Sequence, residues 1–150
     1  MNYWLLKSEP DVFGLDDLKQ VKTEPWDGVR NYQARNMMRD DMKKGDLAFF
    51  YHSNCKVPGI AGIMKVVAES HPDELQFDKN SPYYDPKSQR DKPRWFCVDV
   101  AYERHLQRLI SLQELKEVTD LEDLPLVRKG NRLSIMPVTQ QQWQTILALE

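Results

Sequence analysis

The sequence predicts an α+β fold, in which a small, largely antiparallel sheet or open barrel of strands has helices at its side. The length of 150 residues fits one domain, and we expect residues 1–150 to form it. Hydrophobic residues make up 41% of the chain and charged residues 29%, which is ordinary globular usage. The predicted elements run strand, helix, helix, strands, helix, strand, helix. Consecutive strands argue against a doubly wound parallel sheet.

The first part of the chain alternates short elements with loops. Residues 3–7 form a predicted buried strand, which ends before Pro10 because proline cannot continue a ladder. A short helix is predicted over 15–20. A longer one is predicted over 33–42, where apolar residues recur along one side. Residues 26–32, between the two helices, are predicted to form a loop.

The central part of the chain is predicted to supply most of the sheet. Strands are expected over 47–52, 59–69 and 95–102, and the last of these alternates apolar and polar residues. The polar segment 70–94 contains four prolines. A loop of this length in a compact domain is usually functional or mobile.

Two capping boxes mark helix starts near the end of the chain. Ser111 pairs with Glu114, and Thr139 pairs with Gln142. The first box opens a short predicted helix and the second opens the last helix. A short strand is expected over 133–136, between the two helices.

The sequence lacks the features of a membrane or secreted protein. No stretch approaches the roughly 20 apolar residues of a membrane span. The N-terminus has no basic lead and too short an apolar run for a signal peptide. The two cysteines, Cys55 and Cys97, fit a reducing compartment. We expect no membrane partner and a cytoplasmic location, or a nuclear one if the source is eukaryotic.

No motif for a cofactor, a metal or a catalytic group stands out. The chain has neither G-x-x-x-x-G-K-[ST] nor G-x-G-x-x-G. His52 and Cys55 alone have ligand-like spacing, whereas a structural zinc needs four ligands. Neither cysteine has an evident base, and no pair of carboxylates stands out. We therefore expect no cofactor, no metal, no catalytic residue and no enzymatic activity.

The formal net charge of −2 is unusual for a protein that neutralises many phosphates. Either the ligand is not a long nucleic acid, or the positive charge is local. Basic residues gather in 30–44, 79–94 and 128–132, whereas acidic residues gather in 114–123. Such segregation can give an acidic protein a basic face. Solvated surface charge is the alternative interpretation.

The four tryptophans differ in their surroundings. Trp4 lies within a predicted strand, and Trp143 completes an apolar pair with Val138 at a helix start, so both are expected in the core. Trp26 lies in a loop rich in hydrogen-bonding groups, where it either fills the core or forms a wall of a binding site. We expect the second role, with Trp26 partly exposed. Trp95 follows a basic run and is either a core residue or the lip of a pocket.

Polar side chains gather at three places where the chain leaves an apolar segment. These are Lys7 and Ser8, Arg30 and Asn31, and Tyr51, His52, Ser53 and Asn54. Hydrogen-bonding groups beside an aromatic face are what the reading of a nucleobase requires. Helix caps and turns are the alternative role for these residues. Gly59 opens a strand, either for close backbone packing or for the approach of a ligand.

Six ordered blocks of the sequence resemble the EVE domain family, and together they cover essentially the whole chain. The blocks are residues 3–10, 26–36, 45–54, 58–63, 83–88 and 132–138.

The resemblance implies a PUA-like fold, akin to YTH and ASCH domains, in which an open β-barrel carries helices at its side. It also implies binding of a modified nucleobase, with modified cytosine favoured, in DNA or RNA. A sensor of a free modified nucleoside is the alternative, and an enzyme acting on such a base is the third possibility. The family pattern points to Lys7, Ser8, Trp26, Asn31, Tyr32 and the segment Tyr51, His52, Ser53 and Asn54. The residue patterns add Arg30, Gly59 and Trp95.

Overall fold

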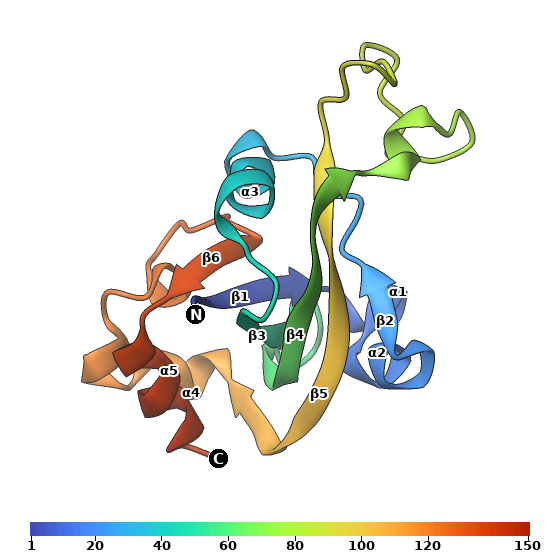
Figure 1. Cartoon of the computed structure of the whole chain (residues 1–150). Helices are drawn as coiled ribbons and strands as arrows, with labels where there is room; N and C mark the ends of the chain where they lie inside the picture. Colours follow the sequence, from blue (N-terminus) through green and yellow to red (C-terminus); the bar gives the residue numbers. More distant parts are fainter.

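The computed structural model describes all 150 residues and is built around one six-stranded mixed sheet (Figure 1). The strands lie in the order β2-β5-β4-β3-β1-β6. Their bounds are β1 Tyr3–Ser8, β2 Thr23–Pro25, β3 Leu47–His52, β4 Gly59–Pro72, β5 Phe96–Ser111 and β6 Ile135–Val138. Only β1 and β3 pair in parallel. The sheet does not close, so the predicted α+β class with an open, largely antiparallel sheet is confirmed.

Short helices surround the sheet. In Figure 1, α1 and α2 lie beside β2, α3 lies above β1, and α4 and α5 lie together near the C-terminus. Their bounds are α1 Pro10–Phe13, α2 Leu15–Val21, α3 Tyr32–Asn36, α4 Leu112–Lys116 and α5 Gln140–Leu147. A π-helical turn, η1 Met37–Asp41, continues α3, and 3₁₀ turns form η2 Glu74–Phe77, η3 Thr119–Leu121 and η4 Pro125–Val127.

The alternation of side chains along the strands produces two apolar clusters, one on each face of the sheet. Trp4 and Leu6 of β1 belong to the first cluster, together with buried residues of α2, α3 and η1. Leu5 belongs to the second, together with residues of α4 and α5. Trp143 stacks on Phe49 there, with 3.8 Å between ring centroids. Trp4 and Trp143 are both 4% exposed, which confirms their predicted core positions.

Both predicted helix starts are present. The Thr139 hydroxyl accepts a hydrogen bond from the Gln142 amide at 3.0 Å, and the Gln142 side chain accepts one from the Thr139 amide at 2.9 Å. The Ser111 hydroxyl accepts from the Glu114 amide at 3.1 Å. The second half of this box is replaced by an ion pair, because the Glu114 carboxylate binds Arg108 at 2.6 Å.

Strand β5 continues nine residues beyond the predicted end at Tyr102. Its pairing with β4 shifts register four times, between Ile60 and His71 on the β4 side. Each shift disturbs the period-two pattern, since a bulge places one extra residue on a strand and increases its twist. The alternation on which the strand prediction rests is therefore lost in the second half of β5.

The segment between β4 and β5, residues 73–95, projects beyond the strands at the upper right of Figure 1. It is held by the buried side chain of Gln76. The Gln76 amide nitrogen donates to the Asp73 and Trp95 carbonyls at 2.7 and 2.8 Å. Its oxygen accepts from the Arg94 and Trp95 amides at 3.1 and 3.0 Å. The predicted long loop is thus anchored to the start of β5.

Candidate ligand pocket

A cavity of about 620 Å³ opens where β1 ends, between α1, the loop after β2 and two further loops. Six of the twelve predicted site residues line it, namely Lys7, Ser8, Trp26, Arg30, Asn31 and Ser53. The other six do not line it, namely Tyr32, Tyr51, His52, Asn54, Gly59 and Trp95.

Trp26 is both a wall of this cavity and part of the core. Its ring packs edge-on against Phe50, with 5.4 Å between centroids, and its amide donates to the Val98 carbonyl at 2.8 Å. The expectation that Trp26 is partly exposed is wrong, since only 7% of the residue is accessible. The physical reason is that the loop continues directly from β2, which lays the indole against the sheet.

Arg30 joins two loops at the rim of the cavity. Its Nη1 donates to Oδ2 of the buried Asp73 at 2.9 Å. Its Nε and Nη2 donate to the Tyr83 carbonyl at 3.0 and 2.9 Å. The guanidinium therefore fixes Tyr83, another lining residue, against the loop after β2.

Tyr32, which we expected in the pocket, and Trp95, expected either at the pocket lip or in the core, do not line the cavity. Their rings stack at 4.7 Å, and Trp95 lies 5.1 Å from the Arg30 guanidinium. Arg35 covers the Tyr32 ring at 4.6 Å. Trp95 is 6% exposed, and its indole nitrogen donates to Asp85 at 2.8 Å. These cation–aromatic contacts hold the Arg30 guanidinium through Trp95.

Ser8 and Asn31 line the cavity and also hold local structure. The Ser8 hydroxyl donates to the Phe13 carbonyl at 2.6 Å. The Asn31 side chain accepts from the Ala34 amide at 2.9 Å and caps α3, as the helix-cap alternative predicted.

Residues 51–54 cover the end of β3 and the loop after it, and their side chains lie on different sides of the strand. Tyr51 points into the second apolar cluster, away from the cavity, and burial raises the pKa of Tyr51 to about 12. The His52 ring accepts a hydrogen bond from the Leu15 amide at 3.1 Å, which holds the start of α2. The Asn54 amide donates to Glu9.

Gly59 serves backbone packing between β4 and β5. A Cβ atom at this position would lie 2.5 Å from the Ile110 carbonyl oxygen and 2.9 Å from the Ser111 Cα. Any side chain would therefore force the two strands apart.

The cavity also has lining residues that the residue patterns did not single out. They are Glu9, Val12, Phe13, Glu24, Pro25, Asp27, Gly28, Val29, Tyr83, Arg132 and Ser134. Several of these fall within the sequence blocks that resemble the EVE domain family, so membership of a block was the available signal. Asp73, which holds Arg30, lies outside every block and carries no sequence signal.

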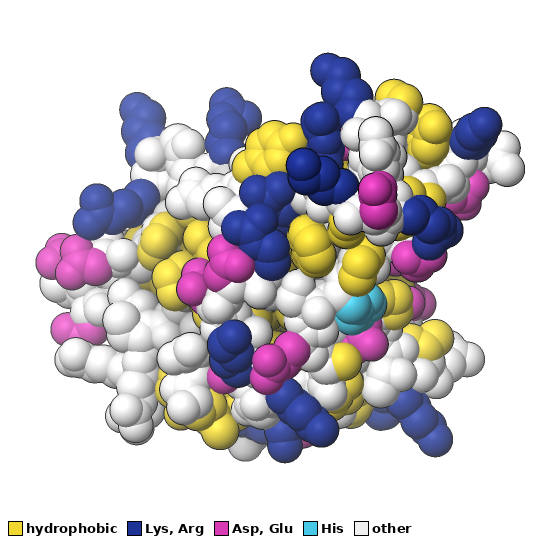
Figure 2. Space-filling view, turned by 45° about the horizontal axis from the view of Figure 1, so that its top comes forward, with side chains coloured by type: hydrophobic (Ala, Val, Ile, Leu, Met, Phe, Trp, Pro, Cys, Tyr) yellow, Lys and Arg dark blue, Asp and Glu magenta, His cyan; other side chains and the backbone are white.

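The cavity contains charged groups of both signs. Burial lowers the pKa of Lys7. Burial together with the charges of Asp73 and Glu24 raises the pKa of Asp27 to about 6. Figure 2 shows Lys and Arg side chains spread across the upper part of the molecule, with apolar side chains exposed between them.

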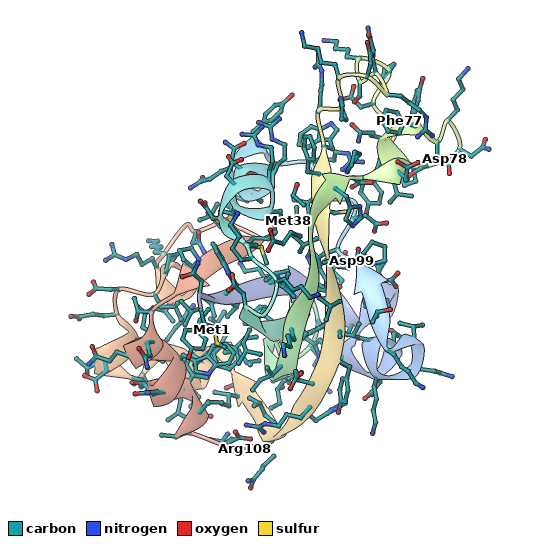
Figure 3. All side chains as sticks on the ribbon, in the orientation of Figure 1. Met1, Met38, Phe77, Asp78, Asp99 and Arg108 are labelled. Atoms are coloured by element: carbon teal, nitrogen blue, oxygen red, sulfur yellow. The ribbon has the colours of Figure 1, made fainter.

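One triad of catalytic residue types lies outside the cavity. The Cys97 sulfur lies 3.8 Å from Nδ1 of His71, and Nε2 of His71 lies 2.8 Å from Asp99, which Figure 3 labels on β5. Cys97 is only 1% exposed, and burial raises the pKa of its thiol. A cysteine nucleophile needs an accessible thiolate, so this arrangement does not meet that requirement.

Three further observations concern metal ligands, Cys55 and membrane-spanning helices. No group of three or more His, Cys, Asp or Glu side chains converges on a point where a metal ion would bind. The Cys55 sulfur donates to the His52 carbonyl and not to its ring. No helix has the length and apolar character to cross a membrane.

Comparison with known proteins gives consistent matches over the whole chain. The family model described as EVE domain matches residues 2–149. Thymocyte nuclear protein 1 from Homo sapiens is 48% identical, over 99% of this chain and 74% of the relative. A solved structure from Pseudomonas syringae is 50% identical with a TM-score of 0.95, and 98% of each chain is covered.

Two further solved structures are similar to this chain in fold. The crystal structure of human THYN1 protein in complex with 5-methylcytosine containing DNA has a TM-score of 0.94 and 48% identity, covering 99% of this chain and 97% of that chain. An ASCH protein from Zymomonas mobilis shares the fold alone, at 12% identity and a TM-score of 0.56. The fold is therefore PUA-like, as the resemblance implied. The family model covers nearly all residues of the chain, and thymocyte nuclear protein 1 and the Pseudomonas syringae protein are about half identical to it. The chain therefore belongs to the EVE domain family.

Proposed function

We propose that this chain binds a modified cytosine in DNA or RNA, with the base held in the cavity at the end of β1, and that it catalyses no reaction. The observation that carries the proposal is the crystal structure of human THYN1 protein in complex with 5-methylcytosine containing DNA. That protein is 48% identical to this chain, with a TM-score of 0.94. The proposed base site is the cavity lined by Trp26 and by polar side chains.

The size and lining of the cavity suit a single base. Small-molecule sites usually measure about 300–1,000 Å³, and this cavity measures about 620 Å³. Trp26 and Phe13 supply aromatic surface, and Ser53 and Asn31 supply hydrogen-bonding groups. One methyl group in an apolar recess contributes roughly 0.8 kcal/mol. Pocket discrimination of one methylene reaches about 10–200-fold, so a non-catalytic pocket suffices for selectivity.

Basic residues adjoin the cavity although the chain carries a net charge of −2. Arg30 and Arg132 line it, and the segment 73–95 reaches it through Tyr83. Local positive charge of this kind suits contact with a few phosphates beside a bound base. We expect about 2–5 neutralised phosphates, which corresponds to a log–log salt slope of about −0.9 per phosphate in duplex DNA.

The deciding experiment compares oligonucleotides that contain 5-methylcytosine or cytosine at one position with free 5-methylcytidine, at several salt concentrations. A preference for the modified oligonucleotide with a moderate salt slope supports the proposal. Equal binding of the modified and unmodified oligonucleotides contradicts it.

A sensor of a free modified nucleoside is the second candidate, and the net negative charge of the chain favours it. Tight binding of free 5-methylcytidine with almost no salt dependence identifies that function, because a nucleoside releases few counterions. Turnover of either ligand would instead identify an enzyme. The name of the Homo sapiens relative, thymocyte nuclear protein 1, agrees with the nuclear alternative for a eukaryotic source.

A further inference from the structure

We propose that Asp27 makes the pocket selective for cytosine bases over thymine and uracil bases, because its carboxylate accepts a hydrogen bond from the exocyclic amine at position 4. The proposal rests on the proposed function, since it requires a base in the cavity. It adds the residue that determines specificity and the atom of the base that this residue recognises.

The backbone on both sides of Asp27 is fixed. Trp26, which precedes it, is packed in the core and donates its amide to the Val98 carbonyl at 2.8 Å. Gly28, which follows it, donates its amide to Asp73 at 2.8 Å. Asp27 therefore lines the cavity from a loop whose backbone is held on both sides, next to Trp26. A group that reads a base needs this kind of fixed position.

The Asp27 carboxyl is not committed to another residue. Asp73 binds Arg30 and two backbone amides, and Glu9 accepts a hydrogen bond from Asn54. No other residue forms a hydrogen bond or an ion pair with the Asp27 carboxyl. An ionised carboxylate can only accept hydrogen bonds, so Asp27 offers an acceptor to whatever enters the cavity.

The two classes of pyrimidine differ at N3 and at position 4, and the exocyclic group at position 4 is the one proposed to face Asp27. Cytosine carries an amine donor there, whereas thymine and uracil carry a carbonyl acceptor. A carboxylate opposite the amine gains a charge-assisted hydrogen bond. Opposite the carbonyl it faces a second acceptor without a proton between them. The same residue therefore attracts one class and repels the other.

Several charged groups surround Asp27 and set its protonation. They are Glu24 of β2, Asp73 after β4, Arg30 of the same loop and Cys97 of β5, and Lys7, Glu9 and Arg132 also line the cavity. Burial and the acidic neighbours Asp73 and Glu24 raise the pKa of Asp27 to about 6, against the opposing effect of Arg30.

The protonation state determines which bases the pocket accepts. Above about pH 6 the carboxyl is ionised and rejects the carbonyl of thymine. Below that pH it is protonated and can donate to the carbonyl. Selectivity for cytosine should therefore grow as the pH rises through about 6.

The test uses two oligonucleotides that differ in one base, 5-methylcytosine or thymine, which carry the same methyl group. We expect wild-type protein at about pH 8 to prefer 5-methylcytosine by roughly tenfold or more, since hydrogen bonds to charged groups contribute about 1.5–3 kcal/mol. The preference should shrink at about pH 5. Asp27→Asn should bind both oligonucleotides within about twofold at either pH, because a neutral amide can donate or accept.

Two other variants show whether the effect belongs to Asp27. Asp120→Asn makes the same charge change at an exposed position on η3 and should keep the preference and its pH dependence. Glu24→Gln changes the neighbouring carboxylate. Loss of the preference in Glu24→Gln with its retention in Asp27→Asn overturns the proposal. Thermal unfolding of each variant confirms that folded proteins are compared.

The failure of this proposal differs from failure of the proposed function. Equal affinity of wild-type protein for the 5-methylcytosine and thymine oligonucleotides, with weaker binding of unmodified cytosine, overturns the role of Asp27 and leaves modified-base binding intact. Absence of binding to all of these oligonucleotides overturns both.

Discussion

Arg30 and Asp73 form an ion pair, with 2.9 Å between Nη1 and Oδ2, in which the carboxylate side chain is only 1% exposed. The two residues lie 43 positions apart in the sequence. Their contact joins the loop after β2 to the segment 73–95, and two more hydrogen bonds from Arg30 hold Tyr83 at the rim of the cavity. The geometry of the candidate pocket therefore depends on a guanidinium group.

Arg30→Lys should keep the charge and lose the geometry. A lysine ammonium cannot donate from a planar fork to Asp73 and Tyr83 together, and it does not stack on Trp95 as the guanidinium does. We expect a loss of about 1–3 kcal/mol in unfolding free energy, measured by urea denaturation. Arg39→Lys is the matched control, since Arg39 pairs only with its exposed neighbour Asp40. Equal stability of the two variants would contradict this role of Arg30.

Gly28→Ala should disturb the pocket through Tyr83. Gly28 has a φ of +81°, and an added Cβ would lie 3.1 Å from the Tyr83 ring. Gly45 has a φ of +96° with open space around its Cβ position, so Gly45→Ala carries the backbone strain alone. That strain costs about 1–2 kcal/mol. We expect Gly28→Ala to unfold at lower urea than Gly45→Ala and to bind oligonucleotides more weakly, and identical behaviour would exclude a role for the Tyr83 contact.

The sequence predicted most elements because their signals are local. The capping box at Thr139 and the apolar residues of β3 act within a few positions. The signals for the pocket are not local. Nothing in the sequence near Asp73 indicates that it holds Arg30. The position of Tyr51 on the side away from the cavity becomes clear only once the pairing of β3 with its neighbouring strands is known. Bulges hid the second half of β5 for the same reason, since they depend on the partner strand.

Trp26→Ala should affect stability and binding together, because the indole belongs to the core and to the cavity wall. The cavity left behind costs about 3–5 kcal/mol. Loss of stacking should weaken the folded fraction's affinity for a base by about 1–3 kcal/mol. Trp143→Ala, at a tryptophan that is also buried in the core, should cost similar stability and leave binding unchanged. Normal binding by folded Trp26→Ala would move the base site away from this wall.

Stability should fall with acid partly through His52. Its ring accepts a hydrogen bond from the Leu15 amide, which requires a neutral nitrogen, and burial lowers the pKa of His52 below 6.5. The unfolded chain therefore takes up a proton that the folded chain resists, so this contribution is full above about pH 6.5 and is lost as the pH falls below it. Urea midpoints measured from about pH 8 to pH 5 should fall less in His52→Gln than in wild type. Parallel curves would show that His52 does not contribute.

Asp27→Asn should stabilise the protein at neutral pH, because the pKa of Asp27 is raised from 3.8 to about 6 by burial and by its acidic neighbours. A carboxyl with a raised folded-state pKa contributes fully below its unfolded value, and the contribution is lost as the pH rises through the folded value. The neutral amide avoids that loss. The variant should therefore exceed wild type in urea midpoint above about pH 6, with the difference vanishing below about pH 4.

Asp120→Asn, at an exposed position on η3, supplies the baseline for this comparison, and its difference from wild type should stay flat with pH. If Asp27→Asn is instead less stable than wild type at every pH, its carboxylate holds the fold and is not free for a ligand. A gain that follows the ionisation of Asp27 has the opposite meaning. It would show that the pocket keeps a charged acceptor at the expense of stability, as expected where a residue serves binding.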